Sequence, residues 1–380
     1  MRKLRILLTG GGTGGHIYPI IAVAQKLREW ALNNGFQPDL RYFGKPGDYR
    51  EALTAAGIKV SGIASSKLRR YASILNFFDF FKFFFGFFQS LWKLYWFMPD
   101  AAFSKGGPGA LAVLSACRFY FIPIAIHESD TVPGLTNRLS SRFAQVIDLA
   151  FVQAGGRFGK TKARINIVGN PVRQVFLTPT PPDQAKTSFG LDPKKPLVLV
   201  FGGSQGSNRM NEFVLANLEP LLLKFQVLHS VGKEKYNEYK NQYEFISKNF
   251  SPLLTASYKF FDYLNDETMN RAMDAADLII ARGGAGAIFE IAAKGKPSIL
   301  VPFPEAANDH QKENAYAYAE TGAAVVVEQE NLLPSIFLSQ AEKIANTPAI
   351  KQKMSGAAKD FYQPEAADKI AADVLSLWQA

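Results

Sequence analysis

Residues 10–16 (GGGTGGH) are the stretch of this 380-residue chain best suited to binding a phosphate. They follow an apolar run (4–8) and precede apolar residues at helical spacing (20–27). A glycine loop between a strand and a helix presents free backbone N–H groups and a helix N-terminus to an anion. Because the loop ends in a histidine, it favours group transfer beside a diphosphate. The simpler alternative is a tight turn with a structural histidine.

The glycine pattern also matches that of a dinucleotide-binding site. Gly10, Gly12 and Gly15 satisfy G-x-G-x-x-G. Dinucleotide folds place an acidic residue near the end of the second strand, where it binds a ribose hydroxyl. Here the second predicted strand (39–43) is followed by glycine and lysine, so nicotinamide chemistry is disfavoured.

Two further polar segments of the first half follow predicted strands. Residues 127–130 (HESD) lie at the carboxyl end of a strand, where an open α/β sheet carries its chemistry. The alternative is a polar loop in which Asp130 caps the next helix. Residues 106–109 (GGPG) either hold a phosphate of a second substrate or form only a turn.

The second half carries comparable segments. Residues 281–290 (ARGGAGAIFE) open a helix whose N–H groups and dipole suit the diphosphate of a nucleotide sugar. Glu290 then lies within reach of a ribose diol, although an acid in a first turn also favours the helix dipole alone. Residues 308–311 (NDHQ) combine donors and acceptors that suit sugar hydroxyls. Arg173 offers a planar fork for a diphosphate, or is a surface arginine.

Strands and helices alternate along the chain, which predicts α/β layers around mostly parallel sheets. The predicted strands are 4–9, 40–43, 101–104, 122–126, 146–149, 197–201, 226–230, 256–260, 278–281, 298–301 and 323–327. The proline-rich residues 178–182 are interpreted as a linker, after which a strand and a glycine loop (202–207) open the second half. Two such halves imply a cleft between them. An amphipathic helix (369–377) is expected to pack back on the first domain.

The composition limits the classes of partner. It is 47% hydrophobic and 20% charged, which is typical of a globular protein long enough for two domains. The net charge of +10 favours an anionic partner, but the basic residues form no nucleic-acid-binding module, so nucleic acid is disfavoured. A single cysteine and no signal-peptide pattern lead us to expect a cytoplasmic protein. The histidines lack metal-ligand spacing, so no metal is expected.

Residues 76–97 are rich in aromatic side chains. Asp79, Lys82 and Lys93 interrupt them, so no apolar run is long enough to span a bilayer. A buried helix pair is one alternative. We favour an interfacial patch, in which rings enter the headgroup region and nearby cations meet anionic lipid. The rings expected there are Phe77, Phe81, Phe84, Phe85, Phe88 and Trp92.

In order along the chain, these motifs resemble one enzyme family over nearly the whole length. They are GGTGGH (11–16), HE (127–128), PGLTN (133–137), GNPVR (169–173), GGSQG (202–206), RGGA (282–285), EIAA (290–293) and DHQ (309–311). The set is similar to that of the MurG family of peptidoglycan N-acetylglucosaminyltransferases. The resemblance implies a glycosyltransferase B fold, with two Rossmann-like α/β domains facing a central cleft. It implies an acceptor- and membrane-binding domain (1–173 with 360–380) and a nucleotide-sugar-binding domain (174–359).

The resemblance also implies an activity and its partners. The reaction is inverting transfer of N-acetylglucosamine from UDP-N-acetylglucosamine to O4 of the N-acetylmuramoyl group of lipid I, giving lipid II for the cell wall. It takes place at the cytoplasmic face of the cell membrane, on an anionic surface and without a cofactor. Glu290 would bind the uridine ribose, and the backbone of Phe261 the uracil. The residues implied around the nucleotide and its diphosphate are Arg173, Ser204, Ala285, Gly286 and Ala287. Those implied at the donor sugar and along the acceptor side are His310, Gln311, Thr13, Gly14, Gly15 and His16.

Inverting transfer needs a base for the acceptor hydroxyl and donors for the departing diphosphate. Two helix N-termini and Arg173 would supply the donors without a metal. His16 is the leading candidate base because an unperturbed imidazole has a pKa near 6.5. Glu128 and Asp130 are the competing candidates, and substrate or water is a further alternative.

The chain departs from the family's pattern in three places. Ser129 and Asp130 stand where glutamine and asparagine are common, which brings a negative charge near the donor's diphosphate. Pro108 stands where a tyrosine is usual, and small or apolar residues replace hydroxyl-bearing ones at 286–289. Two alternatives therefore stay open: another UDP-sugar transferase with a lipid acceptor, and a membrane-bound sugar-nucleotide-binding protein that has lost catalysis.

Overall fold

The computed structural model describes residues 2–65, 74–203, 206–304 and 309–379, and the side chains of these residues except 74–78 and 379. The chain divides into two compact units, Met1–Arg173 with Gln363–Ala380, and Gln174–Tyr362. The chain returns to the first unit at Gln363 and not at residue 360. The reason is that the ring of Phe361 packs against Phe289 and Tyr318 of the second unit, with centroids 4.9 Å apart in both pairs.

Within the described residues, the first unit is built on a seven-stranded parallel sheet in the order β3-β2-β1-β4-β5-β6-β7. Its strands are β1 (Lys3–Thr9), β2 (Gln37–Phe43), β3 (Lys59–Ser61), β4 (Ala101–Ser104), β5 (Ile124–Glu128), β6 (Val146–Leu149) and β7 (Arg164–Ile167). The edge strands β3 and β7 are short and partly exposed, and the sequence did not predict them. The strand predicted from residue 122 begins at Ile124, because the Ile122 N–H donates to Cys117 O at the end of the preceding helix.

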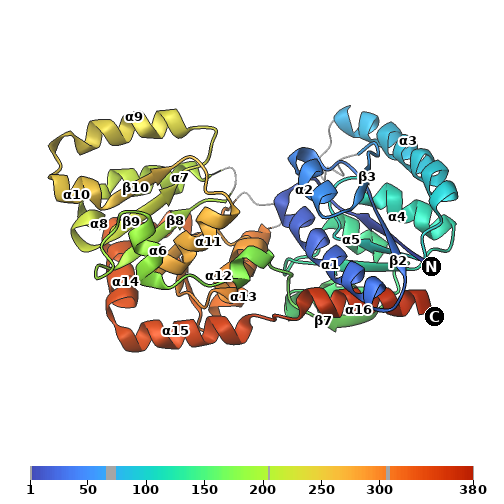
Figure 1. Ribbon diagram of the computed structural model, residues 1–380. Coiled ribbons are helices and arrows are strands. Elements are labelled where there is room, and N and C mark those ends of the chain that lie inside the picture. Colours follow the sequence, from blue (N-terminus) through green and yellow to red (C-terminus); the bar gives the residue numbers. More distant parts are fainter. Residues whose placement is uncertain (1, 66–73, 204–205, 305–308, 380) are drawn as a thin grey trace. The chain divides into compact units, whose positions relative to one another are not determined.

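Helices cover both faces of this sheet (Figure 1). They are α1 (Gly14–Asn33), α2 (Arg50–Ala55), α3 (Ile74–Phe97), α4 (Ala110–Phe119), α5 (Leu135–Ser140) and α16 (Ala366–Gln379), with 3-10 turns at Gly47–Tyr49 and Val152–Arg157. Because strand side chains alternate, the residues of β1 divide between two cores: Leu8 lies with α1 and α16, and Leu7 with α3 and α4. The prediction that the C-terminal helix packs on the first domain is confirmed, since Ile370 and Val374 are buried against α1.

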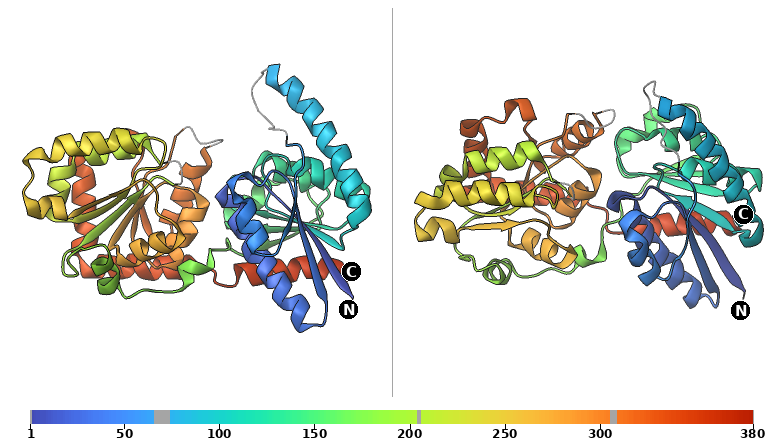
Figure 2. Two further views of the ribbon diagram at one scale, coloured as in Figure 1. Left: turned by 45° about the horizontal axis from the view of Figure 1, so that its top comes forward. Right: turned by 90° about the horizontal axis from the view of Figure 1, so that it is seen from above.

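The described part of the second unit contains a six-stranded parallel sheet in the order β10-β9-β8-β11-β12-β13. Its strands are β8 (Leu197–Phe201), β9 (Gln226–Ser230), β10 (Tyr258–Phe261), β11 (Leu278–Ala281), β12 (Ser298–Leu300) and β13 (Ala324–Val326). Its helices are α6 (Pro182–Ser188), α7 (Asn208–Ala216), α8 (Leu218–Lys224), α9 (Tyr236–Ile246), α10 (Pro252–Ala256), α11 (Asp266–Ala275), α12 (Ala285–Ala293), α13 (His310–Ala319), α14 (Pro334–Asn346) and α15 (Pro348–Phe361). Strand β10 begins later than predicted because α10 extends to Ala256. Figure 2 shows these helices on both sides of the sheet.

The proline-rich residues 178–182 are not a free linker, so that interpretation was wrong. The Thr180 N–H donates to Asp274 Oδ2 (2.9 Å), and Thr178 O accepts from Asn270 Nδ2 (3.1 Å). Both partners lie on α11, so the stretch belongs to the second unit. The chain crosses between the units earlier, at Arg173–Gln174.

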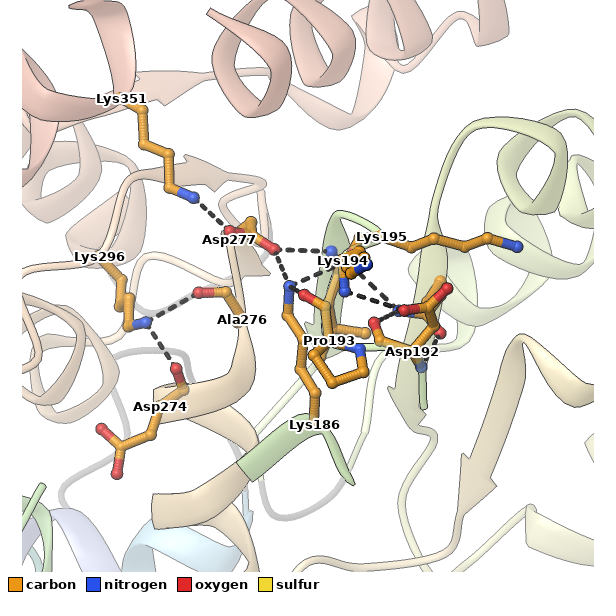
Figure 3. Close-up of polar contacts among 12 residues, drawn as sticks. Lys186, Asp192, Pro193, Lys194, Lys195, Asp274, Ala276, Asp277, Lys296 and Lys351 are labelled. Atoms are coloured by element: carbon orange, nitrogen blue, oxygen red, sulfur yellow. Dashed lines mark hydrogen bonds and ion pairs between the residues drawn. The ribbon is translucent and has the colours of Figure 1, made fainter. Parts of the chain in front are cut away.

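A partly buried ion pair anchors the amino edge of the second sheet, where β8 and β11 begin (Figure 3). Lys186 Nζ donates to Asp277 Oδ2 (2.8 Å) and to Lys195 O (2.8 Å), and the Leu197 N–H donates to the same carboxylate (2.9 Å). Burial acts to raise the pKa of Asp277, but hydrogen bonds from Lys186, Lys351 and Leu197 outweigh it and hold the pKa below its ordinary value. This ion pair lies at the amino edge of the sheet. The loops at the opposite, carboxyl edge therefore remain available to ligands.

Candidate active site

Each sheet has one point at which its strand order reverses direction. In the first unit this point lies between β1 and β4, and in the second between β8 and β11. Ligands of open α/β sheets bind beyond the carboxyl ends of the strands at such a point. The described residues that follow these four strands are 10–13, 105–109, 202–203 with 206–207, and 282–284, so the described glycines of these segments fall there.

In the first unit, the two glycine loops pack directly against each other. A Cβ built on Gly107 would lie 2.8 Å from Gly11 N and 2.9 Å from His16 Nε2, and Gly107 has φ +88°. Only glycine fits both the space and the backbone angle. The Thr136 hydroxyl, on α5, donates to Gly107 O (3.1 Å). The loops after β1, β4 and β5 therefore form one cluster.

His16 lies in the first turn of α1 and faces this cluster. Its Nδ1 lies 2.7 Å from Thr13 Oγ1, so the threonine fixes the ring's orientation. Burial, and then the positive charge of Lys105, lower the pKa of His16 to about 4, although Asp130 acts in the opposite direction. The expectation of a pKa near 6.5 is therefore wrong, because the ring is partly removed from solvent beside a cation. His16 is neutral at physiological pH.

Glu128, at the end of β5, has both carboxylate oxygens engaged. Its Oε1 accepts from the Asp130 N–H (3.1 Å), and its Oε2 from the Gly134 N–H (2.9 Å) and Asn137 Nδ2 (2.9 Å). The side chain is 5% exposed. Glu128 thus holds the loop between β5 and α5 in place, which leaves it poorly placed to accept a proton from a substrate.

The structure also places the two neighbours of Glu128. His127 is fully buried in β5, and its Nε2 lies 2.9 Å from Gly169 O, so it is part of the fold and not of a loop. Asp130 is partly exposed in the loop. It does not cap the next helix, because Gly134 occupies the N-cap position of α5. The capping alternative for Asp130 is therefore wrong.

Arg173, the last residue before the second unit, stacks on α1. Its guanidinium carbon lies 4.8 Å from the centre of the Tyr18 ring, two residues beyond His16. Arginine over an aromatic face is a stabilising contact. The first unit thus presents a cation beside the helix that begins at the glycine loop.

In the second unit, the first turn of α12 is accessible. Gly284 is the N-cap, and a Cβ built on Gly286 would have no neighbour within 4 Å, so the backbone of this first turn is accessible. Glu290 lies four residues after Gly286 and three after Ala287, on the same face of the helix. The first turn of α12 contains no acid, so a dipole role in that turn does not explain Glu290.

The start of α13 is packed against this loop. A Cβ on Gly283 would lie 2.0 Å from Gln311 O, and Asn314 Nδ2 donates to Gly283 O (3.2 Å). Gln311 Oε1 accepts from the Phe303 N–H (3.3 Å). The structure therefore brings Ala285, Gly286, Ala287, Gln311 and the preceding His310 together.

Two other predicted contacts stand apart from this group. Phe261 ends β10, and its carbonyl already accepts from the Val231 N–H (3.0 Å), so a uracil would need the second lone pair of that oxygen. Ser204 lies outside the described residues.

Sequence reasoning assigned no role to two cations at these reversal points, of which Lys105 is buried and Arg282 partly buried. Lys105 directly follows β4 and is 3% exposed, and its Nζ has no hydrogen-bond partner among the described residues. Arg282 follows β11, with its guanidinium carbon 4.8 Å from the centre of the Phe303 ring. In both cases a basic residue stands between an apolar strand and a glycine pair, and this was the signal available in the sequence.

Helix α3 carries an exposed aromatic face. Gly86, Ser90 and Leu94 are buried at helical spacing, and a Cβ on Gly86 would lie 2.5 Å from Ala64 O. The opposite face holds Phe81 (56% exposed), Phe84 (41%), Phe85 (65%), Phe88 (62%) and Trp92 (67%). The alternative of a buried helix pair is wrong for the described side chains, while Phe77 lies outside them. No helix in the described part of the chain is both long and apolar enough to cross a membrane.

Comparison with known proteins gives a consistent result. Residues 6–147 match the N-terminal domain of glycosyltransferase family 28, and residues 197–370 match its C-terminal domain. A UDP-N-acetylglucosamine–N-acetylmuramyl-(pentapeptide) pyrophosphoryl-undecaprenol N-acetylglucosamine transferase of Halothermothrix orenii is 34% identical over 95% of both chains. A protein of the same name from Caldicellulosiruptor saccharolyticus is 35% identical over 97% of this chain and 96% of its own.

Solved structures agree. The crystal structure of Acinetobacter baumannii MurG matches with a TM-score of 0.72 and 26% identity, over 98% of this chain and 99% of that one. A UDP-GlcNAc 2-epimerase from Neisseria meningitidis shares the fold, with a TM-score of 0.68 and 14% identity over 98% of this chain and all of that one. The chain belongs to glycosyltransferase family 28 and, within it, to the MurG family of N-acetylglucosamine transferases.

Proposed function

We propose that the chain transfers N-acetylglucosamine from UDP-N-acetylglucosamine to O4 of the N-acetylmuramoyl group of lipid I, with inversion, and so forms lipid II. The family membership carries this proposal, and the loops support it. The second unit has an open helix start followed by Glu290, as a nucleoside diphosphate requires. The first unit has a neutral imidazole beside a glycine loop.

The reaction is a single displacement. The acceptor O4 forms a bond to the anomeric carbon while the bond from that carbon to the diphosphate breaks, and UDP leaves with the electron pair. The hydroxyl proton passes to His16 Nε2. This atom accepts the proton when Nδ1–H donates to Thr13 Oγ1, the tautomer that the 2.7 Å contact permits. Backbone N–H groups at the start of α12 stabilise the charge that develops on the diphosphate.

The test is transfer of labelled N-acetylglucosamine from UDP-N-acetylglucosamine to a lipid I analogue. Turnover that requires both substrates supports the proposal. Transfer to another lipid-linked sugar in preference to lipid I would instead establish a different UDP-sugar transferase. Donor binding without turnover on any acceptor would show that the protein has lost catalysis. The negative charge of Asp130 near the donor's diphosphate is the feature that favours this outcome.

Glu290→Ala is expected to weaken UDP binding about tenfold to a hundredfold. The carboxylate would accept hydrogen bonds from the ribose diol, and a hydrogen bond to a charged group contributes about 1.5–3 kcal/mol. Isothermal calorimetry with UDP measures the change, and Glu320→Ala, at an exposed acid beyond α13, is the matched control. Equal affinities in the wild type and Glu290→Ala would remove Glu290 from the nucleotide site.

We further propose that the exposed face of α3 binds the cytoplasmic surface of the cell membrane as a peripheral contact. Aromatic rings at helical spacing suit the headgroup region, and the net charge of +10 favours anionic lipid. A lipid-linked acceptor would then be reached from the same surface.

Changing Phe84, Phe85 and Phe88 to serine is expected to weaken binding to anionic vesicles about a hundredfold. Each half-exposed ring contributes about 1 kcal/mol on entering the interface. Vesicle sedimentation measures binding, and higher salt should weaken it further. The control changes Leu223, Phe245 and Leu253, which lie in the second unit and are at least as exposed, to serine. Equal losses in both variants, or unfolding of the first, would contradict a membrane role for α3.

A further inference from the structure

Lys105 is a buried cation without a conventional partner. The residue is 3% exposed, and none of the described residues accepts a hydrogen bond from its Nζ. Its backbone is fixed, because the Lys105 N–H donates to Thr9 O (3.0 Å) and its Cβ lies 3.5 Å from a Cβ built on Gly10. A buried ammonium without an acceptor is costly to a fold, so its presence calls for a reason.

The charges around Lys105 come from the other loops of the same cluster. Glu128 and Asp130, after β5, are the carboxylates whose charge stabilises the ammonium, and His16 and His127 are the imidazoles that it repels. Since the Glu128 carboxylate is held by three N–H donors, it does not move to form a direct pair.

The loop that Lys105 begins packs against both sides of the cluster: a Cβ built on Gly107 would lie 2.9 Å from His16 Nε2, and one on Gly106 would lie 2.6 Å from Asn137 Oδ1. Asn137 in turn donates to Glu128. Burial, and then the charge of Asp130, raise the pKa of Glu128, and the positive charge of Lys105 acts against both.

We propose that Lys105 is a positioning residue that favours the deprotonated form of both His16 and Glu128, so that a neutral base and an ionised loop anchor lie in one cluster. A neutral imidazole is needed to accept the hydroxyl proton, and an ionised carboxylate is needed to accept from three N–H groups. The catalytic part of this inference rests on the proposed function, but the charge relation does not.

Other charged groups near His16 are weaker candidates for this role. Arg173 lies over Tyr18 on α1 and is partly exposed, and Lys45 and Asp48, in the segment that contacts Gly12, are exposed. Solvent screens exposed charges far more than buried ones. Lys105 is the fully buried cation of the cluster.

The wild-type protein provides a test without substrate or mutation. With 13C-labelled histidine Cε1, the four histidines give four NMR signals. We expect His16 to titrate near pH 4 and to show a second, small inflection near pH 8, where burial places the pKa of Lys105. His229, in the second unit, has its pKa lowered by burial with no charged neighbour contributing, so it should lack the second inflection. If the His16 signal also lacks the inflection near pH 8, the proposal is overturned.

Variants give the second test. Lys105→Met removes the charge and nearly preserves the shape, and we expect it to raise the pKa of His16 by about one unit or more. Lys105→Arg should restore most of the wild-type value. Lys162→Met removes an exposed lysine of the same unit and should change nothing. An unchanged His16 titration in folded Lys105→Met would refute the proposal, whether or not the chain transfers N-acetylglucosamine.

Discussion

Replacing His16 with alanine is expected to reduce turnover at saturating donor by about 10²–10⁴-fold, the usual contribution of a general base. The physical reason is that the Nε2 lone pair faces the Gly107 loop, and the ring is held there by Thr13. Transfer of labelled N-acetylglucosamine to a lipid I analogue measures the loss. Thr13→Val is the control. It keeps the His16 imidazole but removes the hydroxyl that orients the ring, and it should reduce turnover about tenfold.

The pH profile gives the second part of this prediction. A base works only when deprotonated, so the rate falls as pH falls through the pKa of His16. Because that pKa is lowered to about 4, the acidic limb of kcat/KM should lie near pH 4 and not near 6.5. The limb should vanish in His16→Ala. If the variant keeps the limb and loses less than tenfold, His16 only binds substrate and Asp130 becomes the better candidate.

The sequence predicted the central strands of both sheets because these strands are buried on both faces and are continuous in apolar residues. It missed β3 and β7, which are short edge strands with little apolar signal. It also took residues 178–182 for a linker. Proline density shows only that a segment is neither helix nor central strand, and the hydrogen bonds that tie Thr178 and Thr180 to α11 come from residues far along the chain.

The site residues likewise divide into those that the local sequence could predict and those that depend on residues far along the chain. Glycine loops after strands were recognisable, because their backbone requirement is local. The pKa of His16 was not, because it depends first on burial by the packed loops and then on Lys105, which is 89 positions away in sequence and is brought near by the β1–β4 pairing. The role of Glu128 was likewise hidden, since a carboxylate in a polar loop gives no sign of how many N–H groups surround it.

Glu128→Ala is expected to destabilise the first unit by about 3–5 kcal/mol, the usual cost of removing one partner from a buried charged network. The change would leave the Asp130 and Gly134 N–H groups and Asn137 Nδ2 without their acceptor, and Lys105 without a fixed counter-charge. All four tryptophans (30, 92, 96 and 378) lie in the first unit, so urea unfolding followed by their fluorescence reports on this unit alone.

Glu128→Gln separates an anchor from a base. It keeps one carbonyl acceptor but turns an NH2 group toward an N–H donor, so we expect an intermediate loss of stability together with reduced turnover. The acidic limb near pH 4 should remain, because it belongs to His16. If Glu128→Gln instead removed the limb and left the urea midpoint unchanged, Glu128 would be the base. The three hydrogen bonds that converge on its carboxylate, which leave little capacity for a substrate proton, argue for the first outcome.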